Sequence, residues 1–176
     1  EWDKSAAAAS IKLFTIPDFE LTHFWKTTSY RGHGTYTGTN PSQGTPISYY
    51  LADAVDSVRI VVSTLHGEEV RNLVGPGEAG MIHRIFWDGR HSPPPLSPSP
   101  DLKPGLIKSK YAYPIQGDLM RYSGPFVSAG IYEIRATAGT STRRAQVRAY
   151  GDNDLSLTLG DEKNREVFLL GLSALH

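Results

Sequence analysis

Residues 131–150 read IYEIRATAGTSTRRAQVRAY, and this stretch decides the fold class. Apolar and polar side chains alternate over residues 132–136, which is the period of two expected of a β-strand with one buried face. Gly139 lies in a short turn, and the alternation resumes over residues 144–149 with arginines at outward positions. The stretch therefore predicts an antiparallel hairpin that is apolar on one side and charged on the other.

Four further runs upstream have the composition of strands, because β-branched and aromatic residues are concentrated between turn signals. These runs are residues 46–51, 58–62, 69–74 and 81–87. Seventeen glycines and twelve prolines likewise favour turns and short strands over long helices. At least six short strands in succession are typical of two packed antiparallel sheets. We therefore expect an all-β chain: an immunoglobulin-like antiparallel β-sandwich with an extended N-terminal arm and a short C-terminal helix.

The sequence divides into three regions of different composition. Residues 1–44 form an arm without sustained periodicity, residues 45–150 carry the expected strands, and residues 151–176 form a tail. The strand-rich region holds a long insertion, residues 88–130, whose first part contains six of the twelve prolines. A segment so rich in proline resists both helix and central strand. We therefore expect the core to come from the strand-rich region, and the flanking segments to contact other molecules.

The tail carries the signals of a helix. Thr158 and Asp161 have the spacing of a capping box, in which two side chains satisfy backbone N–H groups at the helix start. Val167, Leu170 and Leu175 follow at near-helical spacing. We therefore expect an amphipathic terminal helix. Gly171 in its middle costs about 1 kcal/mol relative to alanine, so docking onto a partner or onto the sandwich must supply the stability.

Three short blocks in the strand-rich region form a pattern that is found elsewhere. They are Asn-Pro-x-x-Gly-x-x-Ile-x-Tyr-Tyr-Leu at residues 40–51, Phe-Trp-Asp-Gly-Arg at residues 86–90, and Gly-Pro-x-Val-x-x-Gly-x-Tyr-x-Ile at residues 124–134. In order and spacing they resemble the C-terminal immunoglobulin-like (FlgD-like) β-sandwich of large bacterial BNR-repeat proteins, which are often labelled glycosyl hydrolase or sortilin-like. The resemblance covers residues 40–149 and implies a terminal sandwich.

Two features of that family are missing here. In the family the sandwich follows β-propellers whose repeats carry an S-x-D-x-G-x-T-W Asp-box, and this chain contains no Asp-box. The family's Arg-x-Asp-Pro exit after the last strand is replaced by Arg-Ala-Tyr-Gly-Asp at residues 148–152. The resemblance therefore implies a sandwich without its propeller, to which the hydrolase label does not transfer. A fainter resemblance, resting on the truncated sandwich with its arm, is to an accessory periplasmic subunit of a bacterial photosynthetic reaction-centre complex.

Charge and hydropathy exclude several classes of partner. Eighteen basic residues balance eighteen acidic residues, so no long-range field attracts nucleic acid or anionic lipid. The longest apolar run, residues 167–172, is far below the roughly 20 residues of a membrane-spanning helix. The absence of cysteine removes disulfides, thiolate metal ligands and cysteine nucleophiles. We therefore expect no nucleic-acid partner and no transmembrane segment. These observations do not exclude a membrane protein as the partner.

No arrangement of residues indicates catalysis or cofactor binding. The six histidines are scattered without H-E-x-x-H, which is typical of surface or packing roles. The acidic residues between positions 152 and 162 miss the calcium-loop spacing and indicate a solvated turn. Asp88 lies in a turn, where a carboxylate more often caps backbone N–H groups than acts in glycoside hydrolysis. Nucleophile-elbow, phosphate-loop and dinucleotide motifs are absent. We therefore expect no enzyme, and no catalytic, cofactor-binding or metal-binding residue.

Aromatic side chains are more numerous than one small sandwich can bury. Trp87 and Tyr132 lie within expected strands and are predicted to be core residues. Residues of the arm, the insertion and the tail are candidates for contacts with a partner, because tyrosine and tryptophan are favoured at interfaces. The predicted partner-binding residues are Trp2, Trp25, Tyr30, Tyr36, Pro94, Pro98, Tyr111, Tyr113, Tyr122 and Phe168. The alternative is that the arm wraps around its own domain.

These observations favour a non-catalytic structural or docking subunit that stabilises a larger assembly of protein subunits. By the resemblances, that assembly is extracytoplasmic and periplasmic, with a membrane-associated photosynthetic complex as one candidate. An alternative is a carbohydrate-binding accessory module of a glycosyl-hydrolase-like protein, in which Tyr111 and Tyr113 stack on sugar rings. A third interpretation is a cap or rod-assembly factor like the flagellar hook-cap relatives of the sandwich, which requires self-assembly.

Overall fold

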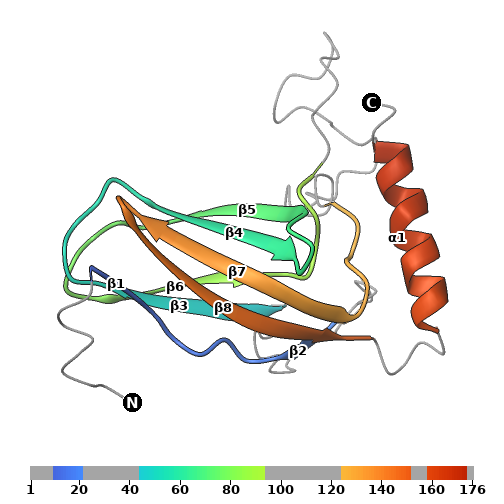
Figure 1. Ribbon diagram of the computed structural model, residues 1–176, viewed down its shortest axis with the longest axis horizontal. Coiled ribbons are helices and arrows are strands. Elements are labelled where there is room, and N and C mark those ends of the chain that lie inside the picture. Colours follow the sequence, from blue (N-terminus) through green and yellow to red (C-terminus); the bar gives the residue numbers. More distant parts are fainter. Residues whose placement is uncertain (1–9, 22–43, 94–123, 152–157, 174–176) are drawn as a thin grey trace, which may run out of the picture.

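Figure 1 shows the computed structural model of the chain, which describes residues 10–21, 44–93, 124–151 and 158–173. Eight strands and one helix lie within these ranges. In chain order they are β1 (Ile11–Leu13), β2 (Phe19–Glu20), β3 (Thr45–Leu51), β4 (Val58–Thr64), β5 (Glu69–Gly75), β6 (Ile82–Trp87), β7 (Gly130–Ala138), β8 (Ser141–Tyr150) and α1 (Leu159–Ser173). The described part of the chain is therefore mostly β, with a C-terminal helix, as the sequence predicted.

The strands form two sheets that lie over one another as layers (Figure 1). One sheet has the order β1-β3-β6, and the other has the order β2-β8-β7-β4-β5. Neighbouring strands are antiparallel except for β2, which runs parallel to β8. The predicted hairpins are confirmed as β4–β5 and β7–β8, and the strands predicted at residues 46–51 and 81–87 are confirmed as β3 and β6.

Apolar side chains from both sheets meet between the layers, because alternate residues of each strand point inward. Every second residue of β3 is buried from Thr45 to Leu51. Trp87 at the end of β6 is fully buried, and its ring lies edge-on to the rings of Phe19 and Tyr132. The centroid distances are 5.4 and 5.3 Å, in the range that aromatic pairs prefer. The predicted core positions of Trp87 and Tyr132 are therefore confirmed.

The N-terminal segment belongs to the core, which corrects the expectation that the core begins at residue 45. Ile11, Ile16 and Leu21 are all buried. β1 pairs with β3 in one sheet, and β2 pairs with β8 in the other, so residues 10–21 pass from one layer to the other. Strands of three and two residues are too short to show a periodicity, and the sequence pattern therefore missed them.

The two described ends of the insertion, residues 88–93 and 124–130, lie at the end of the sheets where β7 begins and β8 ends. α1 stands beside this same end (Figure 1). No helix in the described ranges has the length and apolar character needed to cross a bilayer. The other parts of the expected arm, insertion and tail lie outside the described residues, namely 1–9, 22–43, 94–123, 152–157 and 174–176.

Candidate functional site

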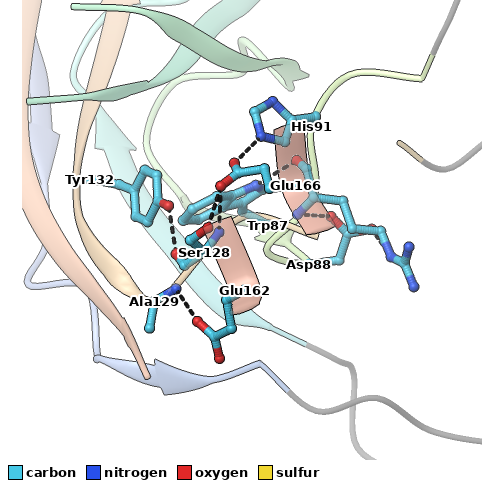
Figure 2. Close-up of polar contacts among 9 residues, drawn as sticks. Trp87, Asp88, His91, Ser128, Ala129, Tyr132, Glu162 and Glu166 are labelled. Atoms are coloured by element: carbon cyan, nitrogen blue, oxygen red, sulfur yellow. Dashed lines mark hydrogen bonds and ion pairs between the residues drawn. The ribbon is translucent and has the colours of Figure 1, made fainter. Parts of the chain in front are cut away.

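A polar cluster joins the C-terminal helix to the end of the two sheets (Figure 2). Three parts of the chain contribute to it: the turn after β6, the segment that leads into β7, and the inward side of α1. Figure 2 shows the two glutamates of α1 directed toward the other two parts. We call the five contributing residues, His91, Ser128, Ala129, Glu162 and Glu166, the helix clamp.

The turn after β6 is held by its own side chains. Asp88 Oδ1 accepts a hydrogen bond from the Arg90 N–H at 3.2 Å, which confirms the capping role predicted for this carboxylate. The indole N–H of Trp87 donates to the Arg90 carbonyl at 3.1 Å, so the buried tryptophan also fixes the turn. Gly89 has a φ of +72°, which favours glycine. The turn thereby places His91 beside the helix.

The segment that leads into β7 pairs with this turn. Arg90 and Phe126 form an isolated antiparallel bridge, and the His91 N–H donates to the Pro125 carbonyl at 2.9 Å. The Arg90 guanidinium lies 3.6 Å from the centre of the Phe126 ring, a cation–π contact. The same guanidinium donates to the Gly124 carbonyl at 3.1 Å. These contacts bring two segments from opposite ends of the insertion together.

β7 in turn supports the part of the clamp that faces the helix. The Tyr132 hydroxyl donates to the Ser128 carbonyl at 2.6 Å in a buried position. Burial raises the pKa of this phenol above its usual range, and the charges of Glu166 and Glu162 raise it further. The hydroxyl therefore stays protonated, and remains a donor, over the whole physiological range. Tyr132 thus fixes Ser128 to the start of β7, where Ser128 contacts α1.

α1 begins in the capping box that the sequence predicted. The Asp161 N–H donates to Thr158 Oγ1 at 3.2 Å, and the Thr158 N–H donates to Asp161 Oδ2 at 3.0 Å. Hydrogen bonds from the side chain and the backbone of Thr158 lower the pKa of Asp161. The predicted helix start is therefore confirmed.

Two glutamates one helical turn apart attach α1 to the sheets. Glu162 is buried, and its Oε2 accepts a hydrogen bond from the Ala129 N–H at 2.9 Å. Glu166 Oε2 accepts from the Ser128 N–H at 3.1 Å and from the Ser128 hydroxyl. The other oxygen of Glu166 accepts from His91 Nε2 at 2.5 Å. The helix therefore supplies partners for two backbone N–H groups that the strands leave unpaired.

Glu166 holds its charge although it is half-buried. Burial alone would raise the pKa of this carboxyl, but hydrogen bonds from His91 and Ser128, together with the charge of His91, outweigh burial and lower it. Glu166 is therefore ionised at neutral pH. Hydrogen bonds to an ionised acceptor are about twice as strong as those between neutral groups. A protonated His91 adds an ion pair to the same contact.

The order of contacts in the helix clamp supports anchoring rather than acyl transfer. In a serine-type triad the imidazole lies between hydroxyl and carboxylate and takes the hydroxyl proton. Here the carboxylate of Glu166 lies between the other two groups, and the Ser128 hydroxyl donates to it rather than to His91. Ser128 is also buried. In the four described ranges, no three His, Asp or Glu residues are grouped so as to hold a metal ion.

Three large apolar side chains of α1 are exposed to solvent. Val167, Phe168 and Leu172 are 69, 65 and 45% exposed, and we call these three residues the exposed helix face. The helical spacing of Val167, Leu170 and Leu175 did not indicate that two carboxylates attach the helix to the sheets. Of these three residues, Val167 is exposed, Leu170 is half-buried and Leu175 lies outside the described residues.

Of the residues predicted to bind a partner, the structure describes Phe168, which lies on the exposed helix face. The others lie outside the described residues: Trp2, Trp25, Tyr30, Tyr36, Pro94, Pro98, Tyr111, Tyr113 and Tyr122. The carbohydrate-binding alternative depended on two of these tyrosines, and it therefore gains no support from the described residues.

Sequence reasoning did not find the helix clamp. Glu162 was assigned to a solvated acidic turn, which is wrong because the side chain is buried and accepts a backbone hydrogen bond. Ser128 and His91 are 38 and 75 residues from Glu166, so no local motif connects them. The one available signal was the i, i+4 spacing of Glu162 and Glu166 on an expected helix.

Comparisons with known proteins do not indicate a function for this chain. The chain matches no protein-family model, no curated protein and no solved structure.

Proposed function

We propose that this chain is a non-catalytic docking subunit that stabilises a larger extracytoplasmic assembly through the exposed helix face. The observation that carries the proposal is that two inward glutamates anchor α1 while three of its large apolar side chains stay exposed. A helix that folds onto its own domain ordinarily places its apolar side inward. Here Glu162 and Glu166 point inward, whereas Val167, Phe168 and Leu172 are exposed. The polar anchor thus leaves three apolar side chains available for contact with a partner.

The exposed helix face is large enough to contribute to binding but too small to bind alone. Burying a Val, Leu or Phe side chain completely contributes about 1.5–3 kcal/mol. Because the three side chains are about half to two-thirds exposed, covering them contributes about 3–5 kcal/mol. A millimolar dissociation constant corresponds to about 4 kcal/mol. A stable partner must therefore contact other surfaces of the chain as well.

The order of the strands supports an immunoglobulin-like arrangement and, with it, the resemblance to FlgD-like sandwiches. In immunoglobulin-type sandwiches a sheet with strands A, B and E faces a sheet with G, F and C, to which a strand C′ can be added. The orders β1-β3-β6 and β8-β7-β4-β5 correspond to these two sheets. Tyr132 near the start of β7 makes the contact of a tyrosine corner, since its hydroxyl donates to the Ser128 carbonyl upstream.

The partners that we propose are other protein subunits in the periplasm, with a membrane-associated photosynthetic complex as one candidate. The balanced charge of the chain supports a protein partner over a polyanion. The periplasmic location and the photosynthetic candidate depend on the family resemblances alone.

The test uses the purified chain and a native extract of its source. Phe168→Glu places a charge on the exposed helix face, and Val74→Glu places the same charge on β5 at a side chain of similar exposure, 71%. We expect the wild type and Val74→Glu to enter a complex of fixed stoichiometry, and Phe168→Glu to stay outside it with unchanged circular dichroism. A wild type that remains monomeric in the extract, or equal assembly by Phe168→Glu, contradicts the proposal.

A further inference from the structure

We propose that the free edge of β6 is a second interaction site, and that it takes an extended strand of a partner protein in which an acidic side chain lies between two apolar ones. This inference goes beyond docking through α1, because it concerns a different element and a different mode of contact. Strand addition supplies affinity through backbone hydrogen bonds and specificity through alternate side chains.

The backbone of β6 has outward-facing polar groups along one side. The Phe14 N–H donates to the Ser48 carbonyl at 3.0 Å, so the backbone groups of Ser48 face β1. Arg84 lies opposite Ser48 in the β3–β6 pair, and opposite residues in an antiparallel pair exchange both hydrogen bonds or neither. The N–H and C=O of Arg84 therefore point away from β3, and by the period of two so do those of Ile82 and Phe86. No described strand pairs with β6 on that side.

β6 differs from the other sheet edges in the described part of the chain. β1 and β2 have only three and two residues. β5 carries Glu69 and Arg71, and its pairing with β4 is irregular between Val62 and Ser63. Short strands, charges and bulges are the means by which proteins block pairing at an edge. β6 carries one charge, Arg84, but it has six residues in regular register and no bulge, so among these edges it is the one suited to strand addition.

The side chains of β6 indicate the chemistry of the added strand. Ile82 and Phe86 are 56 and 43% exposed, and Arg84 lies between them on the same face. Arg84 donates to the Ser48 hydroxyl at 3.2 Å and has no acidic partner in the described ranges. An open groove of about 330 Å³ adjoins Ile82 and Arg84 on the outer face of the sheet. Cross-strand pairs are stabilised by apolar contact or by opposite charge, so the partner residues should be apolar, acidic and apolar.

A second copy of this chain fits the edge less well. Symmetric antiparallel pairing of β6 with itself, centred on Arg84, would place Ile82 opposite Phe86 but would also set the two Arg84 side chains opposite each other. Like charges at directly opposed positions are destabilising. With this register of self-pairing disfavoured, we take the occupant to be a strand of a different protein.

Two blocked synthetic peptides test the side-chain preference. In both, threonines alternate with the residues of one face, which are valine, glutamate and valine in the first peptide and valine, lysine and valine in the second. We expect the wild-type chain to prefer the glutamate peptide and Arg84→Glu to prefer the lysine peptide, each by up to about fivefold, as a cross-strand charge pair allows. Equal affinities in the wild type, or an unchanged preference in Arg84→Glu, would overturn the proposal.

A proline variant tests the backbone. Ile82→Pro removes an outward N–H and leaves the ladder to β3 intact, so its melting temperature should stay close to that of the control Ile82→Ala, while binding of both peptides is lost. Amide exchange in the free chain should be fast at Arg84 and Phe86. Slow amide exchange at these residues would mean that another part of the chain covers the edge of β6. A dimer that is lost in Ile82→Pro would mean that a second copy occupies this edge. Either result refutes the proposal. Neither result affects docking through α1, which Phe168→Glu tests separately.

Discussion

The three hydrogen bonds to Glu166 allow the stability of the α1 anchor to be predicted. Glu166→Gln keeps the size of the side chain, removes its charge and replaces one of its two acceptor oxygens with an NH2 group that cannot accept a hydrogen bond. The carboxylate accepts from the Ser128 N–H, the Ser128 hydroxyl and His91 Nε2. A hydrogen bond to a charged group contributes about 1.5–3 kcal/mol, against about 0.5–1.5 kcal/mol for a neutral one. A loss of about 1 kcal/mol at each bond weakens docking of α1 by about 3 kcal/mol.

This loss should melt the helix and leave the sheets folded. A helix of 15 residues is marginal in water, so α1 depends on its attachment to the sheets. We expect Glu166→Gln to lose helical circular dichroism. Amide exchange in α1 should rise by about a hundredfold, the ratio that corresponds to about 3 kcal/mol, while amides in β4 and β7 keep their protection.

Glu133→Gln is the matched control for this experiment. Glu133 lies 3.5 Å from Arg144 on the outer surface of the β7–β8 hairpin, where an ion pair contributes about 0–1 kcal/mol. The control should therefore leave exchange in α1 at the wild-type rate. If Glu166→Gln behaves like Glu133→Gln, the helix is held by contacts other than the clamp, and the reasoning is refuted.

Acid and two kinds of small substitution test the same structure. The pKa of Glu166 is lower in the folded chain, so the anchor is fully stabilising above the ordinary value of 4.5 and weakens as the pH falls through the lowered value. Helical circular dichroism should therefore fall before the sheet signal in an acid titration, and simultaneous loss would contradict this. Thr158→Ala should lower helix stability by about 1 kcal/mol, measured as faster amide exchange in α1. Amide exchange at the wild-type rate would mean that the Thr158 cap does not stabilise the helix. Gly44 and Gly67 have φ values of +86° and +89°, but a Cβ at Gly44 would lie 1.9 Å from the Trp87 carbonyl, whereas at Gly67 it meets nothing within 4 Å. Gly67→Ala should lower the free energy of unfolding by about 1–2 kcal/mol, measured by thermal unfolding, and Gly44→Ala should lower it further. Equal losses would mean that the close contact between Gly44 and the Trp87 carbonyl does not limit the side chain at residue 44.

Strands that alternate over several residues could be predicted from the sequence, and the shortest strands could not. β7 and β8 show their period of two within a single hairpin, so local pattern was sufficient for them. β1 and β2 instead pair with distant partners, as Ile11 does with Leu51 and Phe19 with Ala149. Their positions depend on apolar burial in the finished sandwich, which no local window contains.

The same distinction applies to the candidate site. The capping box was predictable because Thr158 and Asp161 contact each other within one turn. Glutamate on a helix is ordinarily exposed, so Glu162 and Glu166 carry no sign of burial in the sequence. Their partners are supplied only when the turn after β6 and the segment before β7 come together. Two of the four donors there are backbone N–H groups, which every sequence contains.

Residues 10–21 pass from one layer to the other and add an edge strand to each sheet, so this segment links the two sheets. Deleting residues up to Leu21 would leave cavities at the buried positions of Ile11 and Ile16. It would also remove an edge strand from each sheet. A fragment designed to start at Thr45, the boundary that composition suggests, would therefore be a poor choice for expression, and tags or fusion partners belong ahead of Ser10.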